Sequence, residues 1–378
     1  MHPTFFILPL IALIPICFYF YKYIAAMAEF FGMSRKHRKA KVLIITLLAI
    51  IIAFANSFFS IGFFTIVHII VFALIMALIN LIYRKAAKVP KGKGRTKEDA
   101  NLWEKIYGCR LVPIILAAVF MIYGYFNMTN VIEKDFTITT DKELSQDYTV
   151  AMIADLHMGV SMDVETLEEY CQEISAKNLD FLVITGDMVD EDTTKEEMIG
   201  ACKAIGNIET RYGIYYVWGN HDATQFIWPP DYTIEELQAE LKANGIVELQ
   251  DETALINNEI NIVGRKDAAY LLADRKTVTE MMDSLNKDNY TIVLDHQPIT
   301  LEETSQSGAD LQLSGHTHAG QLLPLGYLME MFGYCDLKEG YADWNGMDVI
   351  VSSGFAGFGS PIRTESHSAY EIITITGE

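Results

Sequence analysis

The sequence predicts a module of membrane-spanning helices over residues 1–130, followed by a layered α/β domain over residues 131–378. Charge supports this division: the first part carries 15 Lys and Arg against 4 Asp and Glu, and the second carries 14 against 45. Long uncharged stretches lie in the first part, whereas short apolar runs alternate with helical patterns in the second. A chain of 378 residues is long enough for about two domains.

Three uncharged stretches in the first part are long enough for transmembrane helices: residues 4–21, 42–83 and 111–132. A helix needs about 20 apolar residues to cross the hydrocarbon core. The middle stretch therefore predicts two spans with a tight turn near residues 56–62, which makes four spans in all. We expect the first span to be retained. A signal peptide begins with Lys or Arg before its apolar stretch, and no such residue precedes this span.

Two basic segments predict how these spans are oriented. Residues 34–41 and 84–97 are rich in Lys and Arg and adjoin the ends of spans, and such loops stay in the cytoplasm. Four spans then place the α/β domain on the extracytoplasmic side of a multi-pass cell-membrane protein, whose first partner is the lipid bilayer. We expect no nucleic-acid partner, because the folded domain is acidic.

Apolar runs with strand-like composition recur along the second part. They cover residues 148–157, 180–190, 213–222, 260–267, 290–298, 311–318, 348–354 and 370–376. Helical patterns separate the first three, and fewer helices separate the rest. This order predicts a layered α/β protein with one or two central sheets.

Capping signals predict where the first helices begin. Asp163 is a suitable N-cap, and Thr194 and Thr233 are each followed three residues later by Glu, which is a capping box. The helix after Thr233 should stop at Gly245, because glycine is favoured just past a helix end.

Polar side chains gather at the C-terminal ends of the predicted strands, where open α/β sheets place their ligand sites. Seven of them could bind a metal: Asp155, His157, Asp187, Asn220, His296, His316 and His318. In an extended segment, residues two apart point the same way, so Asp-x-His and His-x-His can each aim two ligands into one crevice. Imidazole, carboxylate and amide oxygen suit Mn, Fe or Zn.

Each of these polar clusters alone is more often a turn or a surface pair. Their joint occurrence, each at the end of a strand, is what predicts a metal site. Seven ligands are too many for one tetrahedral ion, so they suit two divalent ions that share a bridging carboxylate. Neighbouring glycines would let the backbone approach the ions closely.

The motifs "DLH" (155–157), "GDMVD" (186–190), "GNHD" (219–222), "DHQP" (295–298) and "GHTHAGQ" (315–321) resemble the calcineurin-like metallophosphoesterase superfamily, in particular its bacterial membrane-associated branch. The resemblance covers roughly residues 145–378. Ala319 stands where glycine is usual, and "SAYEI" (368–372) replaces a usual Pro-Glu-Ile, but neither departure falls on a predicted ligand. The fold that this resemblance implies is a four-layer α/β/β/α sandwich of two sheets flanked by helices.

The resemblance also implies roles for single residues. One ion would be held by Asp155, His157, Asp187 and His318. The other would be held by Asn220, His296 and His316, with Asp187 bridging the two. His221 would lie near the substrate and off the metals. The implied activity is phosphoester hydrolysis, in which a hydroxide formed between the ions attacks phosphorus and His221 protonates the leaving oxygen or stabilises the transition state.

Two further side chains have two interpretations each. Asp222 could orient His221 or a ligand, or could be a simple turn carboxylate. Arg363 could contact the phosphate or form a structural salt bridge.

The charge of the second part restricts the substrate. An excess of 31 acidic over basic residues, from 45 against 14, repels long polyanions, although salt screens this beyond about 10 Å. A small or membrane-tethered phosphoester is therefore favoured, either a phosphodiester or a lipid-linked phosphate or pyrophosphate. The apolar segments 225–230 and 321–335 are predicted to form a rim that receives lipid, with ordinary core packing as the competing interpretation.

A different class of function is compatible with the same motifs. The domain could be a non-catalytic metal-binding sensor carried by a membrane protein. The complete ligand set favours an enzyme, because a decayed site usually loses ligands.

Overall fold

The computed structural model describes residues 4–33, 35–54, 61–88, 100–222, 231–268, 275–360 and 362–377. The chain forms two compact units, Met1–Tyr123 and Gly124–Glu378. The division falls inside helix α5 (Leu111–Thr129), so that the end of this helix belongs to the second unit. The sequence predicted this boundary after residue 130, which is a few residues beyond the observed division.

The first unit is helical. Besides the start of α5 it contains α1 (Thr4–Phe30), α2 (Arg35–Phe54), α3 (Ile61–Ala86) and α4 (Leu102–Cys109). Its small core includes Phe20, Tyr23, Val42, Ile69 and Ala117.

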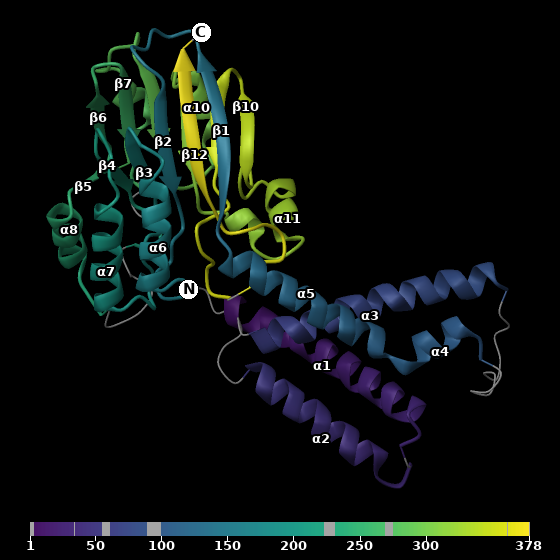
Figure 1. The fold of residues 1–378 in the computed structure, drawn as a ribbon. Helices are drawn as coiled ribbons and strands as arrows, with labels where there is room; N and C mark the ends of the chain where they lie inside the picture. Colours follow the sequence, from purple (N-terminus) through teal and green to yellow (C-terminus); the bar gives the residue numbers. More distant parts are fainter. Residues whose placement is uncertain are drawn as a thin grey trace. The chain divides into compact units, whose positions relative to one another are not determined.

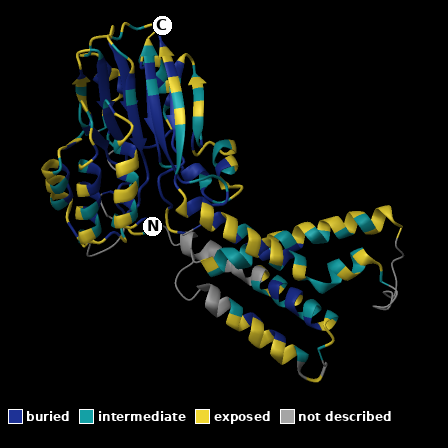
Figure 2. Cartoon of the chain, viewed as in Figure 1, coloured by how far each residue is buried: buried dark blue, intermediate teal, exposed yellow. Residues whose placement is uncertain are grey.

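Two helices among the described residues are long and apolar enough to cross a membrane: α3, with a mean hydropathy of 2.7, and α5, with 1.9. Much of the apolar surface of α3 is exposed, including Leu78 and Leu81, and Figure 2 shows exposed residues along this helix. The other two expected spans fall on α1 and α2, where part of the side chains lies outside the described residues. The turn expected near residues 56–62 is also largely outside them, except that Ile61 and Gly62 are the first residues of α3.

The second unit contains two six-stranded sheets (Figure 1). The first has the order β1 (Ile132–Thr140), β12 (Ala369–Gly377), β2 (Tyr148–Ile153), β3 (Phe181–Thr185), β4 (Ile214–Val217) and β5 (Ile246–Glu248). The second has the order β10 (Gly340–Trp344), β11 (Met347–Val351), β9 (Leu311–Ser314), β8 (Tyr290–Leu294), β7 (Ile260–Gly264) and β6 (Glu252–Ile256). Both sheets are mixed: β2 to β5 are parallel to one another, and so are β11, β9, β8 and β7, with antiparallel neighbours beyond them.

Alternate strand residues enter different cores, because successive side chains point to opposite faces of a sheet. Val150 and Met152 of β2 lie in the cluster shared by the two sheets. Ala151 and Ile153 lie in a second cluster on the other face of the first sheet. Both faces of these strands are therefore buried, which explains their continuous apolar sequence.

Helices cover the outer face of each sheet. The first sheet carries α6 (Val164–Ser175), α7 (Lys195–Gly206) and α8 (Ile234–Ala243). The second carries α9 (Val278–Met282) and α10 (Leu301–Gln306). The α/β prediction with two sheets is confirmed, and the packing of these helices produces four layers.

The predicted helix starts are confirmed. Asp163 caps α6 by accepting a hydrogen bond from the backbone of Thr166. Thr194 and Thr233 form capping boxes at the starts of α7 and α8. Helix α8 ends at Ala243, and Gly245 has a φ of 73° just beyond it. A short helix that was not predicted, α11 (Leu325–Met331), follows the last histidine motif.

The strands determine where the functional side chains lie. Strand β12 points to the end of the domain marked C in Figure 1, and β2 is antiparallel to β12. The parallel strands β2, β3 and β4 therefore all end at the opposite edge of the domain. The turns after these strands meet the turns after β8 and β9, which carry the histidine motifs.

Candidate metal centre

Three of the predicted ligands form a first group after β2 and β9. Asp155, His157 and His318 are buried, and their ligand atoms lie within 4.8 Å of one another. The Nε2 atoms of His157 and His318 are 3.1 Å apart, and His318 Nε2 is 3.5 Å from Asp155 Oδ1. The backbone N–H of His316 donates to both Asp155 oxygens, at 2.9 and 3.0 Å, and so fixes the carboxylate.

A second group gathers the turns after β3, β8 and β9. The ligand atoms of Asp187, His296 and His316 again lie within 4.8 Å of one another. His296 Nε2 is 3.1 Å from Asp187 Oδ2 and 3.3 Å from His316 Nδ1. The Oδ1 atom of Asn220 is also 3.3 Å from His296 Nε2, so the amide joins this group.

Asp187 lies between the two groups. Its Oδ2 atom is 3.1 Å from His296 Nε2 in the second group and 3.7 Å from His157 Nε2 in the first. One carboxylate therefore contacts both sets of imidazoles, as a bridging ligand must.

The histidine rings are held so that selected nitrogens face the centre. His296 Nδ1 lies 2.8 Å from the carbonyl oxygen of Thr185, so Nδ1 carries the proton and Nε2 faces Asp187. His157 Nδ1 lies 3.3 Å from Asp190 Oδ2, which leaves its Nε2 toward His318. A carboxylate or carbonyl on the outer nitrogen is the usual way to orient a metal-binding imidazole.

The backbone is strained at these positions. Positive φ values occur at Asp155 (52°), His157 (38°), Asp187 (52°), His316 (71°) and His318 (48°). Such conformations cost non-glycine residues about 1–3 kcal/mol each and gather at functional sites. The strain turns each chain segment sharply after its strand and points the side chain inward.

Two glycines make room for the ligands. A Cβ atom on Gly186, which has a φ of 90°, would lie 2.4 Å from His296 Nδ1. A Cβ atom on Gly219 would lie 2.2 Å from Asp187 Oδ1. Both approaches are too close for any larger residue.

Burial and neighbouring charges act in opposite directions on the pKa values of the buried groups. Burial raises the pKa of Asp155 to about 6. Burial opposes ionisation of Asp187 too, but the neighbouring His296 outweighs it and lowers the pKa of Asp187. The pKa of His296 is raised in turn, because Asp187 outweighs the effect of its burial. Positive charge next to Asp187 therefore stabilises its ionised carboxylate.

The last two histidines are suited to supply lone pairs. Burial lowers the pKa of His316 to about 3, and burial together with His157 and Arg363 lowers that of His318 well below its usual value. Both rings are therefore neutral at pH 7. Neutral imidazoles that converge with ionised carboxylates are the donors that divalent transition ions prefer, so the residues present fit two such ions.

His221 lies at the edge of this centre. Its backbone N–H donates to Asp187 Oδ1 at 2.8 Å, and its ring centroid is 5.2 Å from that of His157. Nδ1 lies 2.9 Å from both carboxylate oxygens of Glu191. Glu191, which sequence reasoning missed, follows the "GDMVD" motif directly, and its position beside that motif is the signal that could have identified it.

Asp222 positions the turn after β3. Its carboxylate accepts hydrogen bonds from the backbone N–H groups of Asp187 (2.8 Å), Met188 (2.9 Å) and Gly219 (2.6 Å). It therefore orients a predicted ligand through the backbone, and Glu191 instead holds the ring of His221.

The side chain of Arg363 is fully buried. Its guanidinium donates to the backbone carbonyls of Ser353, Ala356 and His367, and Nη2 lies 3.4 Å from His318 Nδ1. It supports the loop beside His318, which differs from both interpretations of the sequence.

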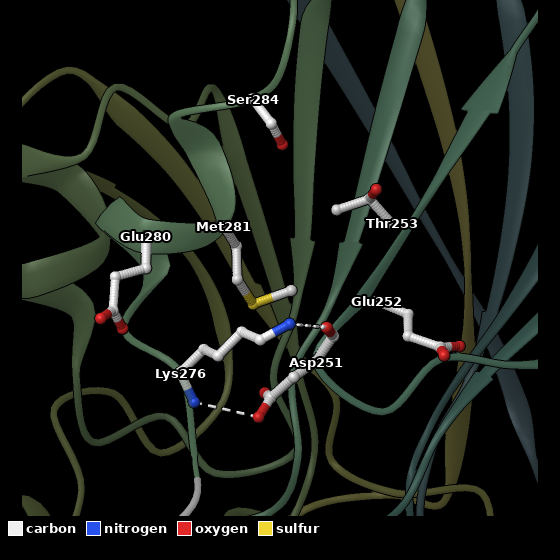
Figure 3. Close-up of a pocket in the computed structure, with 7 residues that line it drawn as sticks. All are labelled: Asp251, Glu252, Thr253, Lys276, Glu280, Met281 and Ser284. Atoms are coloured by element: carbon white, nitrogen blue, oxygen red, sulfur yellow. Dashed lines mark hydrogen bonds between the residues drawn. The ribbon is translucent and has the colours of Figure 1, made fainter.

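A cavity elsewhere in the second unit contains none of the predicted ligands (Figure 3). Asp251, Lys276, Glu280 and Met281 are among its lining residues. The Asp251 carboxylate accepts from the backbone N–H groups of Lys266 and Lys276, both at 3.0 Å. This carboxylate therefore stabilises a loop. The candidate ligands lie instead at the strand ends.

Comparison with known proteins identifies the family that the motifs resemble. The family model described as calcineurin-like phosphoesterase matches residues 148–320. An uncharacterized metallophosphoesterase of Helicobacter pylori is 29% identical over 235 residues, which cover 61% of this chain and 60% of that protein. A second, of Campylobacter jejuni, is 27% identical over 279 residues, covering 71% and 70%.

A protein of Danio rerio named as a transmembrane protein with a metallophosphoesterase domain is 27% identical over 278 residues. The match covers 68% of this chain and 60% of that protein. The chain thus spans between 60% and 70% of the length of these three relatives.

Proposed function

Because this chain belongs to the calcineurin-like phosphoesterase family through residues 148–320, we propose that it is a membrane-anchored hydrolase that cleaves a phosphoester with two divalent metal ions. The observation that supports this most is the meeting of two buried ligand groups around one carboxylate, Asp187. A single structural ion would need only one of these groups.

We assign the ligands as the sequence predicts. Asp155, His157 and His318 would hold one ion, Asn220, His296 and His316 would hold the other, and Asp187 would contact both. When bound, such a pair of ions lowers the pKa of a water molecule and offsets charge on the phosphoryl oxygens. The choice among Mn, Fe and Zn belongs to this proposal, since imidazole and carboxylate ligands accept all three.

His221 would act on the leaving group. Glu191 engages Nδ1, which makes Nε2 the nitrogen that would face a substrate. Burial opposes the charged form of His221, but the hydrogen bond that Nδ1 donates to Glu191 outweighs burial and raises the pKa of His221. A protonated His221 can donate a proton to the leaving oxygen.

The setting supports a lipid-linked or small phosphoester as the substrate. Helices α3 and α5 have the length and composition of membrane spans, and tethering an enzyme to the surface that carries its substrate raises their effective concentration. The basic segments near residues 34–41 and 84–97 favour a cytoplasmic side for those loops and an extracytoplasmic side for the hydrolase domain.

The test is the paired loss of metal and turnover in Asp187→Asn. The full chain in detergent should carry two ions by elemental analysis and hydrolyse bis(4-nitrophenyl) phosphate. Asp187→Asn should lose metal and activity together, because the bridging charge is removed. Asp163→Asn is the matched control: it makes the same chemical change at an exposed helix cap that asparagine also serves.

Two results would contradict the proposal. Full metal occupancy in Asp187→Asn would exclude the bridging role. A chain that binds two ions but hydrolyses no phosphomonoester, phosphodiester or lipid phosphate would instead support the sensor interpretation.

A further inference from the structure

An apolar surface is exposed on α11 and its flanking loops. It consists of Leu323, Leu325, Tyr327, Met331, Phe332 and Tyr334, and we call it the α11 surface. Met331, Phe332 and Tyr334 are 66%, 67% and 71% exposed. Single exposed apolar residues are ordinary, but six within one short segment are typical of an interaction site.

The α11 surface adjoins the metal centre. Helix α11 begins seven positions after His318. Gln321, which lies between them, is hydrogen-bonded to the loop that carries Phe358. The side chain of Gln321 donates to the carbonyl of Phe358 at 3.0 Å and accepts from its N–H at 2.9 Å. The Phe358 ring in turn lies 4.6 Å from the ring of His221 and 5.2 Å from that of His157. The segment that leads into α11 is therefore bonded to a loop whose aromatic ring lies beside His221 and His157.

The same loop joins α11 to the end of α5. The carbonyl of Gly124 in α5 accepts a hydrogen bond from the backbone N–H of Arg363 at 2.9 Å. The next residue, Thr364, accepts from the N–H of Leu323 through Oγ1 at 3.1 Å. Residues 363–364 thus hold the end of a candidate membrane span and the start of the α11 surface together.

The end of α5 is itself apolar and exposed. Tyr125 and Phe126 are 51% and 61% exposed, and they belong to the same compact unit as α11. A bilayer that contains α5 would end near these residues, because aromatic side chains concentrate at the membrane–water boundary. The start of the α11 surface is therefore linked, within one unit, to the end of α5 that would lie at this boundary.

The chemistry of the segment selects lipid as its partner. Residues 321–335 carry one charged side chain, Glu330, which accepts a hydrogen bond from the backbone N–H of Lys338 at 2.9 Å. With no basic residue in this stretch, contact would come from apolar and aromatic insertion rather than from attraction to anionic lipid.

We propose that the α11 surface inserts into the bilayer interface beside the end of α5 and holds the metal centre at the level of the lipid headgroups. This rests on the proposed membrane anchoring, and it identifies the substrate class as a phosphoester carried by a membrane lipid. It also gives the apolar segment 321–335 the role of a lipid-contacting rim. Residues 225–230, the other part of the predicted rim, lie outside the described residues.

The first experiment measures depth in the bilayer. Cys17→Ala and Cys109→Ala remove the partly exposed cysteines and leave three buried ones. The full chain is placed in phosphatidylcholine nanodiscs with a fluorophore on one introduced cysteine, and quenching by doxyl-labelled lipid is recorded. The positions are Met331→Cys in the α11 surface, Val119→Cys in α5 and Leu255→Cys in β6, which are 66%, 59% and 54% exposed.

We expect lipid quenching at positions 331 and 119 and none at 255. Quenching at 119 with none at 331 would overturn the α11 proposal and leave the anchoring intact. No quenching at 119 would overturn the anchoring and, with it, the proposal that depends on it.

The second experiment measures the use of this contact. The double variant Met331→Ser, Phe332→Ser changes two exposed side chains and should fold normally. In nanodiscs we expect hydrolysis of 4-nitrophenyl hexadecyl phosphate to fall about tenfold, through lost positioning at the surface, with unchanged hydrolysis of bis(4-nitrophenyl) phosphate. Leu255→Ser is the matched control.

An equal fall on both substrates, or no fall on either, would contradict the role of the α11 surface. Absence of hydrolysis of both substrates in the unsubstituted chain would contradict the proposed function instead. The quenching experiment would then still decide whether α11 contacts lipid.

Discussion

At the scale of single residues, the most informative pair is His221 with Glu191. The imidazole lies against the metal ligands without belonging to either group, and both oxygens of Glu191 lie 2.9 Å from its Nδ1. A carboxylate in this place fixes the ring orientation and favours the protonated form. The pair therefore suits the proposed proton donation, whereas His157 and His318 suit the proposed metal binding.

Removing the His221 imidazole should separate catalysis from metal binding. In His221→Ala we expect both ions to remain by elemental analysis, since no ligand is removed, and kcat to fall by about 10²–10⁴-fold as for loss of a general acid. Unchanged turnover would remove His221 from the mechanism.

Replacing Glu191 should shift the pH profile. Glu191 raises the pKa of His221, so Glu191→Gln should lower it. A general acid works while it is protonated, and activity is lost as pH rises through its pKa. The alkaline limb of the kcat/KM profile should therefore move to lower pH in Glu191→Gln. Glu196→Gln, at an exposed position in the first turn of α7, should leave the limb in place, and an unmoved limb in Glu191→Gln would exclude this coupling.

At the scale of elements, the site is a set of sharp turns at the ends of five strands. Each turn has to leave its strand, reverse direction and present a ligand within two or three residues. Glycine next to a ligand supplies both the conformation and the space, as at Gly186, and neighbouring ligand residues accept positive φ themselves.

A pair of glycine variants tests the need for that space. Gly186 and Gly245 both have positive φ, at 90° and 73°, so alanine costs each about 1 kcal/mol of backbone strain. Only at Gly186 would the new Cβ atom meet His296. Gly186→Ala should therefore lose metal and turnover, whereas Gly245→Ala should lose only stability, measured by thermal unfolding. Equal metal content in the two variants would show that His296 can move aside.

The sequence could predict those elements whose pattern is local. Strands such as β2 and β3 are buried on both faces, and their apolar runs end in polar motifs that predicted the ligand turns. The capping boxes at Thr194 and Thr233 were equally visible. Strands β1, β5, β6 and β10 were not predicted, because they lie toward the sheet edges and mix polar with apolar residues.

Features that depend on tertiary contacts could not be predicted. The helix α11 was missed because its seven residues are too few for a clear period, and the exposure of its apolar residues depends on what packs around them. The contacts of Arg363 with backbone carbonyls depend on a loop whose path the sequence does not specify. The pairing of Glu191 with His221 crosses thirty positions in the chain.

At the scale of the whole molecule, part of the negative charge of the acidic domain is buried in the site. Asp155, Asp187 and Asp222 are buried together, and burial raises the pKa of both Asp155 and Asp222 to about 6. Arg363 is a buried cation that interacts electrostatically with Asp155, and burial lowers its own pKa to about 10. Divalent ions would neutralise this excess and so stabilise the fold as well as supply chemistry.

Metal removal should therefore destabilise the second unit. A ligand present at 100 times its Kd adds about 2.7 kcal/mol per site to the free energy of unfolding. We expect a chelator to lower the unfolding midpoint of the full chain in detergent and to have no effect on Asp187→Asn. The midpoint is followed through tryptophan fluorescence, to which the buried Trp218 of the second unit contributes. The gap between loaded and metal-free protein should also depend on pH. Asp155 has a raised pKa, so in the metal-free protein its contribution to stability is present below its unfolded pKa and is lost as pH rises toward 6. Metal binding requires the same carboxylate to be ionised, so the gap should widen as pH rises from about 5 to 7. A midpoint that does not respond to chelation in this range would show that the two ligand groups do not hold ions in the folded protein.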